Sequence, residues 1–309
     1  MRLRSVDLML PQVASAAEFL QNIWGLVPAG ISGRTRFFRG TADHPYIFSI
    51  AEGAANAVAA ITHAGTPEEI EQAGARAIEA GVPHQRVGAF DVPGGCGGFI
   101  VQGPEGQVYR LIAETSRPER LQDRDQPMQI THAVMNAVDV AGCERFAAGV
   151  LGFKVTDRTR HMTFMRCNRK HHCVAYVHSD VSSFNHVAFE MRDIDAVMRG
   201  FGRMRDAGFQ SVWGPGRHGP GNNVFGYFIA PFGAVIEYTA EVSEIDNGHQ
   251  AGGPDDWKWP PGRIDHWGMS TKDVAKIGAA ERAFRFTPGL LPTQSRGRIG
   301  GVTFPGRAQ

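Results

Sequence analysis

PFGAVIEYTAE at residues 231–241 repeats PEGQVYRLIAE at residues 104–114, and the two stretches align when the sequence is shifted by 127 positions. Further matches in this register are Val13 with Val140, Phe19 with Phe146, Gly25 with Gly152 and Ala80 with Ala207. The register holds without a gap from residue 13 to residue 114, and similarity at a fixed period is the signature of a repeated structural unit. The chain is therefore a duplication, with two halves built on one plan.

Each half divides again into two similar units. Residues 131–155 and 185–209 both carry a short strand, a turn at Asp139 or Asp193, an amphipathic helix and a Gly-Phe exit. Strand-like segments follow in both, which predicts four βαβββ modules that begin near residues 3, 54, 129 and 183. Paired modules of this kind would curl their sheets around a shared concavity. We therefore expect an α+β protein with two tandem barrel-like domains.

The predicted domain division follows the repeat. Residues 115–127 are charged, poor in apolar side chains and bounded by proline, as is typical of a linker. The expected parts are an N-terminal domain at 1–117, a linker at 118–128, a C-terminal domain at 129–245 and an extension at 246–309. Within the extension we expect a helix over residues 270–286 that is capped by Ser270, followed by disorder over residues 295–309.

The composition excludes several classes of function. The 309 residues carry a net charge of +1, and no basic stripe indicates nucleic-acid binding. The N-terminus is too short and too polar for a signal peptide, and no run of about 18 apolar residues predicts a membrane span. The four cysteines show neither CxxC spacing nor the density of a disulfide scaffold. We expect a soluble cytoplasmic protein with no nucleic-acid or membrane partner.

The two halves differ where chemistry is expected. Glu237 lies inside an apolar strand, and a buried carboxylate is unfavourable unless a positive charge compensates it. In the first half its counterpart is Arg110, while His132 corresponds to Ser5 and His186 to Ala59. The three potential ligands are therefore confined to the second half. The first half has the scaffold without the site.

His132 and His186 occupy equivalent positions in their own modules, each inside the opening strand. Facing modules would bring them together, with Glu237 on the final strand. Two imidazoles and one carboxylate form a facial metal site that leaves positions open and favours non-haem Fe(II). The alternatives are hydrogen-bonded structural histidines and a salt-bridged glutamate in the sheet.

These residues resemble those of the type I extradiol ring-cleaving dioxygenases, a branch of the vicinal oxygen chelate (glyoxalase-like) superfamily. The similarity covers roughly residues 1–245. It implies two tandem vicinal-oxygen-chelate barrels and a metal-free N-terminal domain. It also implies that His132, His186 and Glu237 bind Fe(II), with Mn(II) possible, and that the enzyme inserts both atoms of O2 into a catecholic substrate beside its diol.

The resemblance also implies catalytic residues. The pair His171 and His172, in RCNRKHHCVAY, matches the acid–base position of the family, and we expect His171 to be that residue with His172 as the alternative. The family has a C-terminal signature of a His, a Tyr, Pro-x-Gly and the ligand Glu, which here is His218, Tyr227, Pro231, Gly233 and Glu237. In this signature His218 and Tyr227 are expected to hydrogen-bond the substrate. The competing interpretations are a solvated turn for the histidine pair, an ordinary loop histidine and a packing tyrosine.

Other positions are less specific. Asn185 is a candidate pocket residue beside His186, and Trp257, Trp259 and Trp267 are expected either to wall the pocket or to anchor the extension. Gly226 stands where the family has a bulky apolar residue, so we expect it to reshape the pocket wall. Cys173 replaces the usual Ser or Thr after the histidine pair.

Three functions remain open from the sequence. The first is an extradiol dioxygenase, with monocyclic, biphenyl-type and fused-ring catechols all possible as substrates. The second is a metal-dependent isomerase, lyase or thiol transferase on the same fold, and the third is a non-catalytic small-molecule-binding protein. We also expect a homo-oligomer.

Overall fold

The computed structural model describes residues 1–115, 117–122, 125–287, 298–299 and 302–303. The N-terminal half contains β1 (Arg2–Leu10), α1 (Val13–Phe19), the π-helix η1 (Leu20–Trp24), β2 (Val27–Ser32), β3 (Thr35–Arg39), β4 (Phe48–Glu52), β5 (Ala57–Gly65), α2 (Pro67–Glu79), β6 (His84–Val87), β7 (Gly98–Gln102) and β8 (Val108–Ala113).

The C-terminal half repeats this order. It contains β9 (Gln129–Ala137), α3 (Val140–Phe146), the π-helix η2 (Ala147–Leu151), β10 (Lys154–Arg158), β11 (Met162–Arg166), β12 (Val174–His178), β13 (Ser183–Glu190), α4 (Ile194–Asp206), β14 (Trp213–Arg217), β15 (Val224–Ile229) and β16 (Val235–Ala240).

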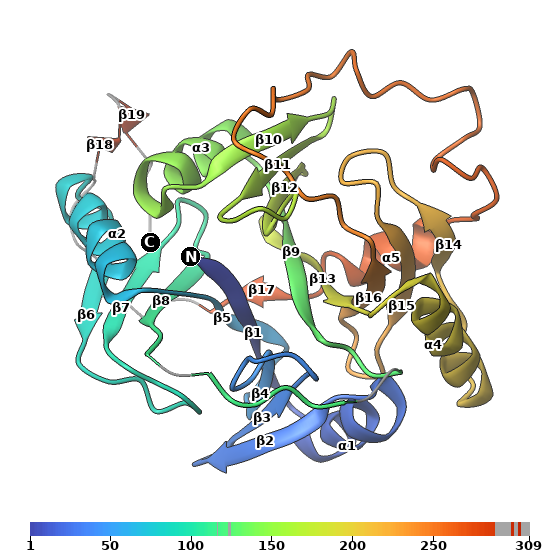
Figure 1. Cartoon of the computed structure of the whole chain (residues 1–309), viewed down its shortest axis with the longest axis horizontal. Helices are drawn as coiled ribbons and strands as arrows, with labels where there is room; N and C mark the ends of the chain where they lie inside the picture. Colours follow the sequence, from blue (N-terminus) through green and yellow to red (C-terminus); the bar gives the residue numbers. More distant parts are fainter. Residues whose placement is uncertain (116, 123–124, 288–297, 300–301, 304–309) are drawn as a thin grey trace.

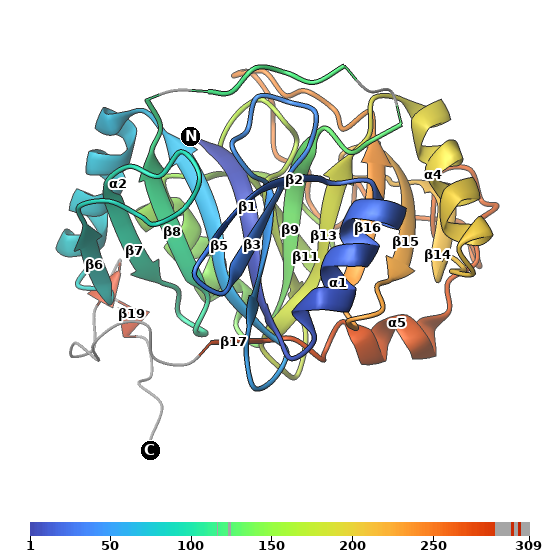
Figure 2. The ribbon, with the colours of Figure 1, turned by 90° about the horizontal axis from the view of Figure 1, so that it is seen from below.

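The strand order is the same in the two sheets. The first runs β2-β3-β4-β1-β5-β8-β7-β6 and the second runs β10-β11-β12-β9-β13-β16-β15-β14. In each sheet the two modules join through one antiparallel pair, β1 with β5 or β9 with β13. Figures 1 and 2 show the two sheets side by side, with the helices on their outer faces. The expected α+β fold of four βαβββ modules in two tandem units is confirmed.

Local structure also follows the duplication. α1 and α3 both continue into a five-residue π-helix, and each π-helix ends at a glycine with positive φ: Gly25 at 94° and Gly152 at 77°. A left-handed residue after a helix suits glycine, which has no Cβ to clash with the preceding turn. The Gly-Phe pair that the sequence predicts after the helix is Gly152 and Phe153 in the second half. Gly152 forms this turn, and Phe153 is buried.

One continuous core joins the two halves. Trp24, at the end of η1, stacks on Tyr238 of β16 with ring centroids 3.6 Å apart, and the Tyr238 hydroxyl donates a hydrogen bond to the Trp24 carbonyl. Tyr109 of β8 and Tyr176 of β12 share a hydrogen bond of 2.8 Å. The sheet of the second half is therefore positioned by side chains of the first. The predicted domain boundaries stay a prediction.

The extension packs against both sheets. Its helix α5 (Val274–Ala280) is capped by Asp273, whose side chain accepts from the Lys276 amide, so the expected cap at Ser270 is wrong. Strand β17 (Arg285–Phe286) pairs with β5. A two-residue pair, β18 (Arg298–Ile299) with β19 (Val302–Thr303), falls in the stretch expected to be disordered, and the rest of residues 295–309 lies outside the described residues. None of the helices in the described ranges has the length and hydrophobicity that crossing a bilayer requires.

Candidate active site

Three neighbouring strands in the middle of the second sheet bring His132, His186 and Glu237 together. Ala188 of β13 pairs with His132 of β9 on one side and with Glu237 of β16 on the other. One ligand atom from each of the three side chains lies within 4.8 Å of the others, and all three residues are buried. The Nε2 atoms of His132 and His186 both lie 3.2 Å from the same oxygen, Oε2 of Glu237.

This geometry fits a divalent cation. Metal bonds of about 2.1 Å at right angles separate neighbouring ligand atoms by about 3 Å, close to the two distances found here. Nε2 of His186 is buried and has no hydrogen-bond partner among the described residues. An unpaired imidazole nitrogen in a buried polar cluster therefore suits a metal ligand.

Hydrogen bonds behind the imidazoles orient both rings. Nδ1 of His186 lies 2.6 Å from Oδ1 of Asn185, and the Asn185 amide is itself oriented because it donates to Oδ1 of Asn136. Nδ1 of His132 lies 2.8 Å from the Thr131 hydroxyl. A proton on Nδ1 leaves the Nε2 lone pair directed at the shared centre.

The charge state of the cluster also suits a cation. Burial opposes the ionisation of Glu237, but the imidazoles of His132 and His186 outweigh it and hold the pKa of this carboxyl below its usual range. Burial lowers the pKa of His132, despite the opposing charge of Glu237. The site therefore places an anionic carboxylate beside the neutral nitrogen donor of His132.

Three further polar side chains surround the cluster. The His172 ring lies against His132, with centroids 4.1 Å apart, and burial lowers its pKa well below the usual value. The Tyr227 ring lies edge-on to His186 at 5.0 Å, and its hydroxyl is 3.0 Å from Nε2 of His218. Burial raises the pKa of Tyr227 and lowers the pKa of His218 to about 3. All three side chains are neutral near pH 7.

His171 lies behind His172. Its Nε2 is 2.6 Å from Oδ2 of Asp157, and its Nδ1 is 3.0 Å from Nδ1 of His172. Asp157 is fixed in turn because its other oxygen accepts the Gly252 amide of the extension. A cavity of about 450 Å³ borders His171 and Asp157, and Trp257 lines it.

One expectation about a neighbouring residue changes. Gly226 faces helix α4, because a Cβ at this position would lie 2.1 Å from the Phe201 ring, so the expectation that it shapes the pocket wall is wrong. Strand alternation explains this, since Tyr227 beside it faces the cluster. Of the tryptophans, Trp259 lies against Gly219, next to His218, and Trp267 lies under Arg217.

Three polar residues near the site were not predicted from the sequence: Asp157, Thr131 and Asn223. Asn223 is fully buried, and its amide reaches Oε1 of Glu237 at 3.4 Å and Oγ1 of Thr239 at 2.8 Å. Thr131 could have been found from its place beside His132. Asp157 could not, because its contact with His171 depends on how β10 packs against the loop before β12.

Known proteins resemble this chain. Residues 129–238 match the family described as Glyoxalase/Bleomycin resistance protein/Dioxygenase superfamily. The chain is 28% identical over 173 residues to Metapyrocatechase 2 of Cupriavidus necator, covering 55% of this chain and 46% of that protein. It is 27% identical over 114 residues to 2,2',3-trihydroxybiphenyl dioxygenase of Sphingomonas paucimobilis, covering 34% of this chain and 39% of that protein. The matches thus span less than half the length of these curated relatives.

Solved structures resemble both halves of the chain. The crystal structure of the Mn(II)-bound glyoxalase from Novosphingobium aromaticivorans is 28% identical, with a TM-score of 0.82, over 97% of this chain and 96% of that chain. The tandem arrangement therefore recurs over almost the full length of a metal-bound relative. The family match covers residues 129–238, the part of the chain that holds His132, His186 and Glu237.

Proposed function

We propose that the protein is an extradiol dioxygenase, which inserts both atoms of O2 into a catecholic ring and opens it beside the diol. The observation that carries the proposal is the convergence of His132, His186 and Glu237 on one point, with Nε2 of each histidine 3.2 Å from the same carboxylate oxygen. The names of two relatives support the same chemistry: a metapyrocatechase and a trihydroxybiphenyl dioxygenase.

The proposed cofactor is Fe(II), held by Nε2 of His132, Nε2 of His186 and the Glu237 carboxylate. A bound Fe(II) would supply the electron path that triplet O2 needs to react with a closed-shell catechol. Mn(II) suits the same donor atoms, and the structurally similar glyoxalase is described as Mn(II)-bound.

We assign the acid–base role to His172 rather than His171. His172 lies against His132 and is neutral, so it can accept a proton from a substrate hydroxyl at the cluster. His171 has one ring nitrogen on Asp157 and the other on His172. It is therefore a positioning residue, which orients the His172 ring.

His218 and Tyr227 would hold substrate oxygens. Their side chains are hydrogen-bonded to each other at 3.0 Å, and the Tyr227 ring lies edge-on to the His186 ring. A neutral tyrosine can donate its proton to a substrate oxygen while His218 accepts or donates with its second nitrogen. Phe225 stacks on the His218 ring at 3.9 Å and fixes its plane.

The test is turnover of a catechol by the reconstituted protein. After anaerobic loading with Fe(II), admission of air with catechol, a dihydroxybiphenyl or a dihydroxynaphthalene should give O2 uptake and a yellow ring-opened product. His186→Ala and Glu237→Ala should lose bound iron and turnover together, because each removes one of three ligands. Iron bound normally by both variants would contradict the assignment.

The second candidate is a glyoxalase-type isomerase or lyase, favoured by the full-length similarity to a Mn(II)-bound glyoxalase. The same preparation distinguishes it. Conversion of a thiol adduct of an oxoaldehyde by the Mn(II) protein, with no O2 uptake on any catechol, would replace the dioxygenase proposal.

We also propose that the enzyme is a cytoplasmic homo-oligomer. The absence of disulfide spacing among the four cysteines supports the compartment. Light scattering of the purified protein tests the oligomer, and a monomeric mass would contradict it.

A further inference from the structure

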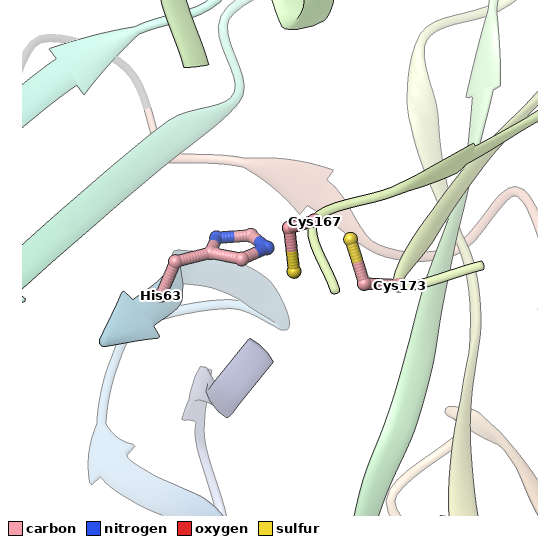
Figure 3. A group of neighbouring side chains, drawn as sticks. All are labelled: His63, Cys167 and Cys173. Carbon is pink, nitrogen blue, oxygen red and sulfur yellow. The ribbon is translucent and has the colours of Figure 1, made fainter. Parts of the chain in front are cut away.

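A second group of potential metal ligands joins the two halves of the protein. His63 lies on β5 of the first sheet, while Cys167 follows β11 and Cys173 precedes β12 in the second. One ligand atom from each lies within 4.8 Å of the others. Figure 3 shows the edge of the His63 ring pointing toward Cys167, with Cys173 beyond it. We refer to these three residues as the His63 cluster.

His63 is unexplained by the fold alone. Its side chain is fully buried, and both ring nitrogens lack a hydrogen-bond partner among the described residues. Its ring neighbours are aromatic: Phe153 at 4.9 Å and Tyr109 at 6.2 Å. Buried polar groups in proteins are almost always paired, so an unpaired imidazole that faces two thiols indicates a missing partner.

The two cysteines supply soft donors beside this imidazole. Both are free thiols, Cys173 buried and Cys167 half-buried. Their neighbouring segments are held in place, since the Cys173 amide donates to the Met165 carbonyl and the Ala133 amide donates to the Cys173 carbonyl. Two sulfurs and one imidazole nitrogen select thiophilic ions such as zinc and copper(I) over magnesium or calcium.

Charge decides between those ions. Two thiolates and a neutral imidazole carry a charge of −2, which a divalent cation neutralises and a monovalent one does not. A net charge left in an apolar interior is strongly unfavourable. The surroundings of the His63 cluster therefore favour a divalent ion.

We propose that His63, Cys167 and Cys173 bind one Zn²⁺, separate from the ion held by His132, His186 and Glu237. Binding forms two Zn–S bonds and one Zn–N bond, and the two thiols release two protons to solvent. Three protein ligands and one water complete the tetrahedron that zinc prefers. The site fastens residues 167–173, which carry His171 and His172, to strand β5 of the other half.

Cobalt(II) is the probe that tests this site. The full-length protein, freed of metal with a chelator and kept reduced, is titrated with Co²⁺ and then with Zn²⁺. We expect thiolate-to-cobalt charge-transfer absorption that saturates by two equivalents, because the His132, His186 and Glu237 site also takes up Co²⁺, and that is abolished by Zn²⁺. The His132, His186 and Glu237 site contains no sulfur, so it cannot produce this absorption, and the result does not depend on the proposed dioxygenase activity.

Variants identify the ligands. Cys167→Ser and Cys173→Ser should each lose most of the charge-transfer absorption, and His63→Ala should keep absorption but bind Co²⁺ at least about 10-fold more weakly. Cys143→Ser is the matched control, because Cys143 is buried but contacts Gln107 rather than the cluster, and its absorption should equal that of the unchanged protein.

Three results would overturn the proposal. One is a folded, reduced protein that shows no thiolate absorption with Co²⁺. Another is absorption that survives in both Cys167→Ser and Cys173→Ser. The third is a Cys167–Cys173 disulfide in the freshly isolated protein, which would make the pair a redox couple. If Cys173→Ser does not fold, Cys167→Ser decides, because its side chain is half-buried.

Discussion

At the scale of single residues, the adjacent histidines 171 and 172 have different surroundings. His172 contacts the His132 ring, whereas His171 is bound between Asp157 and His172. We expect His172→Ala to lower kcat by about 10²- to 10⁴-fold, the range that general acid–base groups contribute, while iron content stays unchanged. Steady-state kinetics with metal analysis measures both quantities.

The matched variants for this prediction are His171→Ala and Asp157→Asn. Both act only through the orientation of the His172 ring, so both should lower kcat less than His172→Ala and by similar factors. Restoring hydrogen-bonding capacity with His171→Gln should recover part of the loss. A larger loss in His171→Ala than in His172→Ala would return the acid–base role to His171.

We expect Asn185 to contribute to metal affinity through its contact with His186. Its Oδ1 accepts the Nδ1 proton of His186 and so keeps the Nε2 lone pair free. We expect Asn185→Ala to weaken iron binding by about 10- to 100-fold, as loss of such an outer partner typically does. A chelator competition assay measures the affinity, and Asn185→Asp, which keeps an acceptor at the same place, should bind close to normally.

At the scale of elements, the two faces of β15 contact different parts of the protein. Tyr227 faces the metal ligands, and Gly226 faces α4, where an added Cβ would lie 2.1 Å from Phe201. We expect Gly226→Ala to lower the free energy of unfolding by about 1–3 kcal/mol through overpacking, with kcat unchanged in the folded fraction. Urea unfolding and kinetics measure the two effects.

Gly202 of α4 is the control for that substitution. A Cβ there would meet nothing within 4 Å, and alanine has the higher helix propensity. Gly202→Ala should therefore raise the free energy of unfolding by up to about 1 kcal/mol. Equal effects of the two substitutions would mean that β15 moves away from α4 at no cost.

The elements also explain which features the sequence could predict. The duplication specifies the order of strands, because each copy constrains the other, and the differences at Ser5, Ala59 and Arg110 point to the metal-binding half. At the place of the metal site, the first sheet instead has Arg110 at 3.4 Å from Asp7. Neighbouring residues of a strand face opposite sides of the sheet, so Tyr227 points inward and Gly226 outward. The expectation that Gly226 shapes the pocket wall did not take this alternation into account.

Contacts between elements could not be predicted. Asp157 of β10 binds His171, and this contact determines that His172 rather than His171 lies beside the metal ligands. The His63 cluster exists only because β5 packs against the loop between β11 and β12. The N-cap of α5 is Asp273 rather than the expected Ser270, because the Ser270 hydroxyl and amide both donate to Asp265. In each case the decisive partner is remote in sequence or belongs to another element.

At the scale of the whole molecule, buried neutral histidines make stability depend on pH. Burial lowers the pKa of His44 to about 3 and that of His63 to about 3, and burial also lowers the pKa of His172. Below pH 6.5 these groups take up protons in the unfolded chain but not in the native protein, so the unfolded state gains stability as the pH falls. Each contributes about 1.4 kcal/mol per pH unit.

We therefore expect the free energy of unfolding of the metal-free protein to fall by about 3 kcal/mol per pH unit below pH 6.5 from His44 and His63 alone. Urea unfolding between about pH 7 and pH 5 measures this slope. His44→Gln, which keeps a polar group near Gln129, should reduce the slope by about 1.4 kcal/mol per pH unit, because one proton-binding site disappears from the unfolded state. A stability that is constant from pH 7 to pH 5 would mean that the buried histidines are reached by protons in the native protein.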